Sequence, residues 1–120
     1  MNILIISNNT FPKQGPRAFR TTELAEQLVK MGHKVILYSV HGHYDYTEYE
    51  KQTGVIMKDI KPKFATSAND ESMRYNLLDR IMYHFFHRLL FWPYCEFHYS
   101  VSRIIKENPN MDMLITIAYP

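Results

Sequence analysis

The sequence predicts an α/β protein with a Rossmann-like parallel sheet. Residues 2–7 contain the continuous apolar run ILII, and residues 34–40 (KVILYSV) contain a second one. Uninterrupted apolar runs of this length are typical of strands that are buried on both faces. A segment with helical periodicity lies between them, so a strand, a helix and a strand follow one another within the first forty residues. This order predicts a βαβ unit with parallel strands.

The segment between the two strands carries helix signals at both ends. Pro16 and Arg17 lie where the helix should begin, and proline suits the first turn because its missing N–H would have no partner there. Gly32, which follows Lys30, predicts the end of the helix. The predicted buried stripe consists of Thr21, Leu24, Ala25 and Leu28, which recur at helical spacing.

The rest of the chain completes the alternation of strands and helices. We predict a polar, aromatic loop over 41–53 and a third strand over 55–60. Two stretches of helical periodicity follow, over 78–89 and 97–107, with a proline between them. A fourth strand is predicted over 111–118. The expected order is therefore β-α-β-β-α-α-β.

Length and composition exclude several classes of protein. A chain of 120 residues is a normal size for one domain. With 14 basic and 12 acidic residues, the net charge of +2 does not predict a partner nucleic acid. A single cysteine excludes an intramolecular disulfide. The start MNILIIS lacks the features of a signal peptide, and no apolar run is long enough to cross a membrane. These observations predict a cytoplasmic protein.

The loop after the first strand is the main candidate binding site. Ligands of doubly wound sheets bind at the carboxyl ends of the strands, and helix N-termini suit phosphate. Gly15 would let a ligand approach the backbone closely, and Arg17 and Arg20 could donate charge-assisted hydrogen bonds to an anion. GxGxxG and GxxxxGK[ST] are both absent, which argues against a dehydrogenase and an NTPase. The alternative is a plain connection whose arginines face water.

The segment HGHYDY after the second strand is a second candidate. His41, His43 and Asp45 alternate, so an extended chain would place them on one side, where a metal could bind. No further histidine or cysteine follows at zinc-like spacing, so we predict no metal site. His41 and His43 are instead assigned to a loop that contacts the acceptor.

Residues 80–99 hold much of the aromatic content of the chain. Aromatic residues at helical spacing usually pack into a core, and we favour that interpretation. The mixture of aromatic and basic side chains also suits a peripheral contact with a membrane surface. A third interpretation is an exposed aromatic surface that forms a homodimer.

Two parts of the sequence resemble a known enzyme family. The segment ILIISNNTFPKQGPRAFRTTELAEQLVKMGHKVILYS resembles the opening of retaining glycosyltransferases of the GT-B fold, family four. The matching residues are Pro12, Gly15, Glu23, Leu24, Ala25, Leu28, Gly32, His33 and Val35. The later segment ENPNMDMLITIAYP is similar to a strand of that family and the loop after it, through Pro109, Asp112 and Pro120. Together the two parts cover about half of the chain.

The resemblance implies a fold and a set of binding residues. Such enzymes have two Rossmann-like halves, of which the N-terminal half binds mostly the acceptor and the C-terminal half binds the nucleotide-sugar donor. The family's glycine loop faces the donor phosphates, a role that maps to Gly15 with Pro16 and Arg17 as neighbours. Gln14 stands where the commonest form of the loop has a further glycine. Tyr119 is assigned to the same substrate-binding edge.

Residues 1–120 are accordingly expected to be a partial N-terminal domain with no second domain and no catalytic residues of its own. The full enzyme would transfer a hexosyl group, with retention and without a cofactor or metal, to a saccharide or lipid-linked acceptor in bacterial polysaccharide or glycoconjugate synthesis. The isolated chain is expected to be inactive, and a location at the inner face of the membrane would fit a lipid-linked acceptor. The alternatives are a stand-alone Rossmann-like binding module without catalysis and a flavodoxin-type flavin or nucleotide binder.

Overall fold

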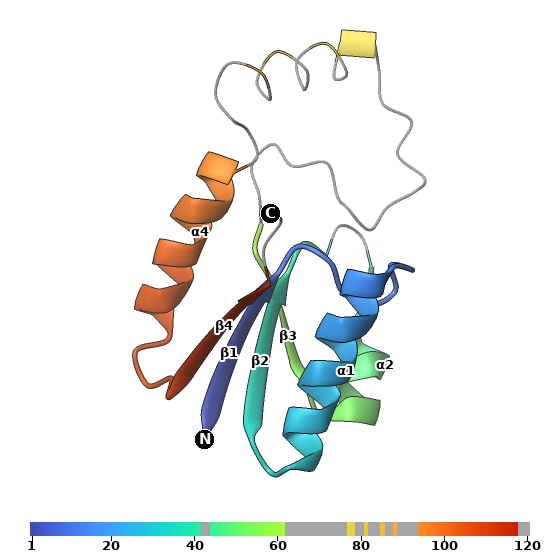
Figure 1. The fold of residues 1–120 in the computed structure, drawn as a ribbon, viewed down its shortest axis with the longest axis vertical. Coiled ribbons are helices and arrows are strands. Elements are labelled where there is room, and N and C mark those ends of the chain that lie inside the picture. The colour runs from blue at the N-terminus through green and yellow to red at the C-terminus, as the bar shows by residue number, and fades with distance from the viewer. Residues whose placement is uncertain are drawn as a thin grey trace.

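The computed structural model is a four-stranded sheet with helices on both faces (Figure 1). The structure describes residues 1–41, 44–61 and 94–117, the side chains of 94–98 excepted, and the single residues 77, 78, 81, 85 and 88. The elements are β1 (Asn2–Ser7), α1 (Pro16–Lys30), β2 (Lys34–Ser39), α2 (Thr47–Thr53), β3 (Ile56–Asp59), α4 (Tyr94–Glu107) and β4 (Met113–Ile117). The predicted α/β class with a Rossmann-like parallel sheet is therefore confirmed.

The strand order is β3-β2-β1-β4, and every neighbouring pair is parallel. Ile6 of β1 pairs with Tyr38 of β2 on one side and with Thr116 of β4 on the other. The chain thus proceeds from β1 through β2 to β3 in one direction, and β4 lies on the opposite side of β1. The order of the strands reverses between β1 and β4.

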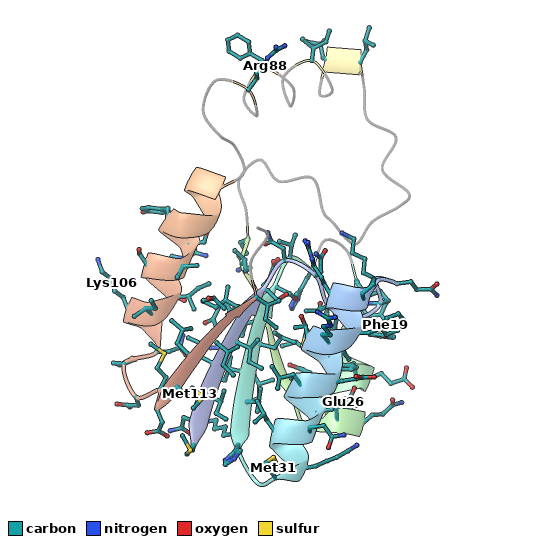
Figure 2. All side chains as sticks on the ribbon, viewed as in Figure 1. Phe19, Glu26, Met31, Arg88, Lys106 and Met113 are labelled. Carbon is teal, nitrogen blue, oxygen red and sulfur yellow. The ribbon has the colours of Figure 1, made fainter. Side chains whose placement is uncertain are left out.

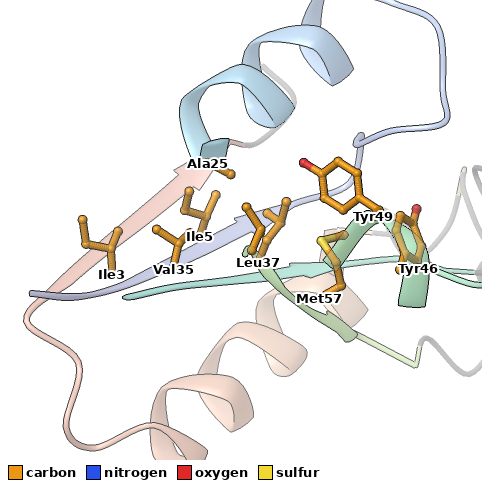
Figure 3. Close-up of a cluster of buried hydrophobic side chains, with 9 residues drawn as sticks. Ile3, Ile5, Ala25, Val35, Leu37, Tyr46, Tyr49 and Met57 are labelled. Atoms are coloured by element: carbon orange, nitrogen blue, oxygen red, sulfur yellow. The ribbon is translucent and has the colours of Figure 1, made fainter. Parts of the chain in front are cut away.

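Helices cover both faces of β1, which explains its uninterrupted apolar run. Ile3 and Ile5 face α1 and α2, where Ala25 and Tyr49 complete one core cluster (Figure 3). Alternate residues of β1 point to the other face, where the second cluster consists of Leu4, Ile6, Tyr38, Val40, Ile60 and Ile104, the last from α4. Figure 2 shows side chains filling the space between the sheet and both helical layers.

Helix α1 begins at Pro16 and ends before Gly32, as predicted. Its buried face differs from the predicted stripe. Leu24 is 37% exposed, whereas the fully buried side chains are those of Ala18, Thr21 and Ala25. Small side chains on this face let the helix backbone lie close to the sheet, so the larger Leu24 is left at the margin. The prediction that Leu24 is buried was therefore wrong.

The prediction of a loop over 41–53 was wrong in its second half, where α2 forms. Asp45 lies just before the N-cap residue Tyr46, and its Oδ1 accepts hydrogen bonds from the backbone N–H of Thr47 at 3.0 Å and from the Thr47 hydroxyl at 2.6 Å. Gly54 ends the helix in the left-handed region, with φ of 75°. With only seven residues, the helix is too short to show a clear apolar period in the sequence.

The start of β4 is tied to the start of β1. The backbone N–H of Asn2 donates to Asp112 Oδ2 at 2.6 Å, and the N–H of Asp112 donates back to the carbonyl of Asn2 at 2.8 Å. The Asn2 side chain also donates to the carbonyl of Asn110 at 3.1 Å. These bonds fix the connection between α4 and β4 at the amino-terminal edge of the sheet.

Most of the aromatic segment 80–99 lies outside the described residues. Leu78, Ile81 and Phe85 are helical, and their side chains are 74%, 59% and 57% exposed. Within the segment, Ile81, Phe85 and Tyr99 are exposed and do not pack into the core of the described residues. The interpretation stays a prediction for the rest of the segment. No helix among the described residues is long and apolar enough to cross a membrane.

Candidate functional site at the carboxyl edge of the sheet

The point at which the strand order reverses defines the candidate site. β1 ends at Ser7 and β4 ends at Ile117, and their parallel pairing places both ends at the same edge. In open α/β sheets, ligands bind outside the carboxyl ends of the strands at such a reversal. The loop over 8–15 and the start of α1 follow directly after β1 at this edge (Figure 1). Tyr119, predicted for the same edge, lies outside the described residues.

Buried hydroxyl groups form the base of the site. They belong to Ser7, Thr10, Thr21 and Ser39. Ser7 Oγ lies 3.2 Å from Thr21 Oγ1, which in turn donates to the carbonyl of Arg17 at 2.9 Å. The backbone N–H of Asn9 donates to Ser7 Oγ at 3.2 Å. These bonds join the end of β1, the loop and the first turns of α1 into one polar unit. Ser39 Oγ, at the end of β2, is buried without a hydrogen-bond partner among the described residues.

The N-terminus of α1 is open toward the loop. No described side chain caps it, and Pro16 occupies its first turn. Gly15 has extended backbone geometry, with φ of 176°, which any residue can adopt. A Cβ at Gly15 would meet no described atom within 4 Å. The fold therefore does not require glycine here, and the space beside this backbone can admit a ligand.

The segment from Asn8 to Thr22 contains three cationic residues and no carboxylate. Lys13 Nζ donates to Asn9 Oδ1 at 3.1 Å, and partial burial lowers the pKa of the Lys13 ammonium. Arg17 is half-buried and Arg20 is exposed. Positive charge beside the N-terminal end of a helix favours a bound anion such as phosphate.

An aromatic cluster that was not among the predicted site residues lies beside the loop. Phe11 stacks on Tyr49 of α2, with ring centroids 5.4 Å apart and an angle of 14° between the rings. Tyr44 meets Phe11 edge to face at 5.8 Å and Tyr46 at 4.8 Å. The His41 ring lies 4.4 Å from that of Tyr46. The cluster therefore joins the segments that follow β1 and β2.

Hydrogen bonds fix the backbone of Phe11 from two sides. Its N–H donates to Thr22 Oγ1 at 3.1 Å, and its carbonyl accepts the hydroxyl hydrogen of Tyr46 at 2.6 Å. The Tyr46 hydroxyl also lies 3.4 Å from Thr10 Oγ1. The conformation of the loop therefore depends on side chains from α1 and from the start of α2.

His41 lies at the end of β2, as predicted. Its Nε2 is buried and has no hydrogen-bond partner among the described residues. Burial lowers the pKa of His41, and this effect outweighs the charges of Asp59 and Glu50 and a hydrogen bond to the Lys58 backbone, which act in the opposite direction. No group of three potential metal ligands occurs among the described residues. His43 lies outside them.

A signal for the aromatic cluster is present in the sequence. Tyr44, Tyr46 and Tyr49 follow the second strand, and Phe11 follows the first. Because parallel neighbouring strands end at the same edge, aromatic residues just beyond both ends are expected to meet there.

The comparisons with known proteins do not extend these observations. No family model matches the chain, and no curated protein and no solved structure gives a significant match.

Proposed function

We propose that this chain is the N-terminal, acceptor-binding portion of a nucleotide-sugar-dependent retaining glycosyltransferase. The observation that carries the proposal is the placement of the loop over 8–15. This loop lies at the reversal of strand order, at the carboxyl edge where α/β sheets bind their ligands. It is also the segment whose residues resemble the glycine loop of family-four enzymes.

The geometry supports a role for this loop toward a departing nucleoside diphosphate. The uncapped N-terminus of α1 and the charge of Arg17 favour the binding of a negatively charged group. The open backbone at Gly15 leaves space for that group. Fixed dipoles and cations of this kind lower the barrier to transfer by stabilising charge that develops on the leaving group. The catalytic residues, and most of the contacts to the donor, would belong to a second half of the enzyme. The isolated chain would therefore be inactive.

The acceptor would be a saccharide or a lipid-linked saccharide bound at the same edge. His41 and the loop that follows it would contact this acceptor. A lipid-linked acceptor would bring the enzyme to the inner face of the membrane, with a role in bacterial polysaccharide or glycoconjugate synthesis.

The test is sugar transfer by the native gene product that carries this sequence. We expect labelled hexose to pass from a nucleoside diphosphate sugar to a saccharide or lipid-linked acceptor with retained anomeric configuration. Gly15→Val should reduce transfer strongly, because its side chain would fill the space beside the loop. Transfer with inverted configuration, or unchanged activity of Gly15→Val, would overturn the proposal.

A non-catalytic binding module is the main alternative outcome of this test. The native product would then bind a nucleotide or saccharide at the carboxyl edge and transfer nothing. A yellow colour on purification would instead identify the flavodoxin-type alternative.

A further inference from the structure

Two exposed aromatic rings are held in fixed positions at the carboxyl edge. Phe11 and Tyr44 each leave 41% of their surface exposed. Their ring planes are nearly perpendicular, at 83°, so the two rings form a corner. They come from the segments after β1 and β2, the strands whose carboxyl ends lie beside each other.

The scaffold beneath Phe11 determines which part of its ring is exposed. Tyr49 stacks on the Phe11 ring nearly in parallel. Tyr49 therefore covers one face of the Phe11 ring, Tyr44 contacts the ring edge to face, and 41% of the Phe11 surface stays exposed. Thr22 and Tyr46 hold its backbone through the hydrogen bonds described above. An apolar ring fixed in this way loses little conformational freedom when a ligand binds to it, which favours affinity.

Phe19 provides a contrast within the same region. It is 57% exposed near the N-terminal end of α1 (Figure 2). Among the described residues, no aromatic ring packs on it. Scattered exposed apolar residues of this kind are normal on protein surfaces. Phe11 and Tyr44 differ because they contact each other and rest on a buried aromatic scaffold.

We propose that Phe11 and Tyr44 form a stacking platform for a pyranose ring of the acceptor saccharide. The face of an aromatic ring carries partial negative charge, which attracts the polarised C–H groups on the apolar face of a pyranose. This inference rests on the proposed function, which makes a saccharide the expected occupant of the edge.

The surroundings of the platform suit a small amphipathic ligand. Gln14 and Asp45 are exposed, and Lys13 is partly exposed, in the same two segments. Small-molecule sites combine apolar surface with a small number of polar groups that fix the orientation of the ligand. The hydroxyl groups around a pyranose ring can bond to such a margin while one face of the sugar covers Phe11.

The experiment titrates the 120-residue chain with methyl pyranosides of glucose, galactose and N-acetylglucosamine. Aromatic proton–carbon spectra report each ring separately. We expect the ring signals of Phe11 and Tyr44 to shift with at least one of these pyranosides while those of Phe19 remain in place. Glucitol, which has the hydroxyl groups but no pyranose face, should leave all three rings unshifted.

Variants separate stacking from simple loss of the fold. Phe11→Leu keeps an apolar side chain on Tyr49 but removes the flat ring, and it should weaken pyranoside binding about fivefold, the effect of one aromatic contact. Phe11→Tyr should restore binding, and Phe19→Leu is the matched control that should leave it unchanged. The proposal is overturned if none of the pyranosides shifts the rings, if Phe11→Leu and Phe19→Leu behave alike, or if uridine shifts the rings and the pyranosides do not.

The platform and the proposed function can fail separately. The ring shifts report the platform alone, whereas transfer by the native gene product reports the enzyme. Pyranoside binding without transfer by the native product would retain the platform and reject the transferase. If the native product transfers sugar, Phe11→Leu does not change this activity and the pyranosides do not shift the rings, the transferase function stands and the stacking platform is rejected.

Discussion

The hydroxyl of Tyr46 donates a hydrogen bond of 2.6 Å to the carbonyl oxygen of Phe11, across a sequence separation of 35 residues. This bond links the loop after β1 to the segment after β2 at the carboxyl edge of the sheet. Tyr46 is itself buried, with only 4% of its surface exposed. The geometry of the candidate site therefore depends on a contact between two loops and not on the sheet alone.

Tyr46→Phe should loosen this link without leaving a cavity. The substitution removes the hydrogen bond to the partly buried carbonyl of Phe11, so we expect the free energy of unfolding to fall by ~1 kcal/mol in urea denaturation. Amide exchange should also accelerate at Phe11, whose N–H donates to Thr22. Tyr99→Phe is the matched control, because Tyr99 is 72% exposed. Equal stability of the two variants would show that the bond does not hold the loop.

Substitution by alanine should affect stability little at Gly15 and strongly at Gly54. A Cβ at Gly15 meets no described atom within 4 Å, and its φ of 176° suits any residue. We therefore expect Gly15→Ala to change the unfolding free energy by less than ~0.5 kcal/mol. Gly54 has φ of 75°, and its Cβ would lie 3.1 Å from Val29 Cγ1. Gly54→Ala should therefore cost ~1 kcal/mol or more.

Thermal unfolding of both glycine variants checks this contrast. A large loss of stability in Gly15→Ala would mean that the fold itself needs glycine at this position. The space beside the loop could then no longer be assigned to a ligand. With the fold intact, any loss of ligand binding by Gly15→Ala can be attributed to the site.

The regular part of the fold was predictable because it depends on local pattern. The apolar runs of β1 and β2, with Pro16 and Gly32 at the two ends of α1, identify the βαβ unit without any long-range information. The strand order could not be read in this way. The position of β4 beside β1 depends on non-local contacts, such as the reciprocal hydrogen bonds between Asn2 and Asp112.

The candidate site was predictable in location and only partly in composition. Gly15 and Arg17 were identified because they occupy a helix start after a buried strand. Phe11 and Tyr44 were missed: their positions after two neighbouring strands predict that they meet, but the contact between the two rings is visible only in the tertiary structure. Leu24 was placed in the core because helical spacing alone does not show that the sheet needs small residues such as Ala25 at close approach. The binding roles assigned to Gly15, Pro16, Arg17, Arg20, His41, His43 and Tyr119 all stay predictions.

The stability of the fold should decrease on acidification because of His41. Burial lowers the pKa of its folded form from 6.5, so the unfolded chain binds a proton at a higher pH than the folded chain does. By linkage, His41 has no effect on the pH dependence well above pH 6.5 and reduces stability as the pH falls through 6.5 toward the folded pKa. Denaturation curves across this range measure the effect.

His41→Gln removes this titrating group. The difference in unfolding free energy between the wild type and His41→Gln should be constant well above pH 6.5. Below that pH, the wild type should become less stable relative to the variant. Asp59→Asn removes a charge that raises the pKa of His41 and keeps an oxygen that can accept the His41 N–H. That variant should lose stability more steeply on acidification. Parallel curves for the wild type and His41→Gln would contradict the assignment.

Asp112 should act on stability and not on ligand binding. It belongs to the second segment that resembles family-four enzymes, yet it lies just before β4, at the amino-terminal edge of the sheet and away from the candidate site. Asp112→Ala removes the acceptor for the Asn2 N–H and should lower the unfolding free energy by ~1 kcal/mol. Asp112→Asn, which keeps an acceptor oxygen, should lose less. Pyranoside titration of both variants should match the wild type. A loss of pyranoside binding with unchanged stability would instead make Asp112 a binding residue and would move the site to the opposite edge of the sheet.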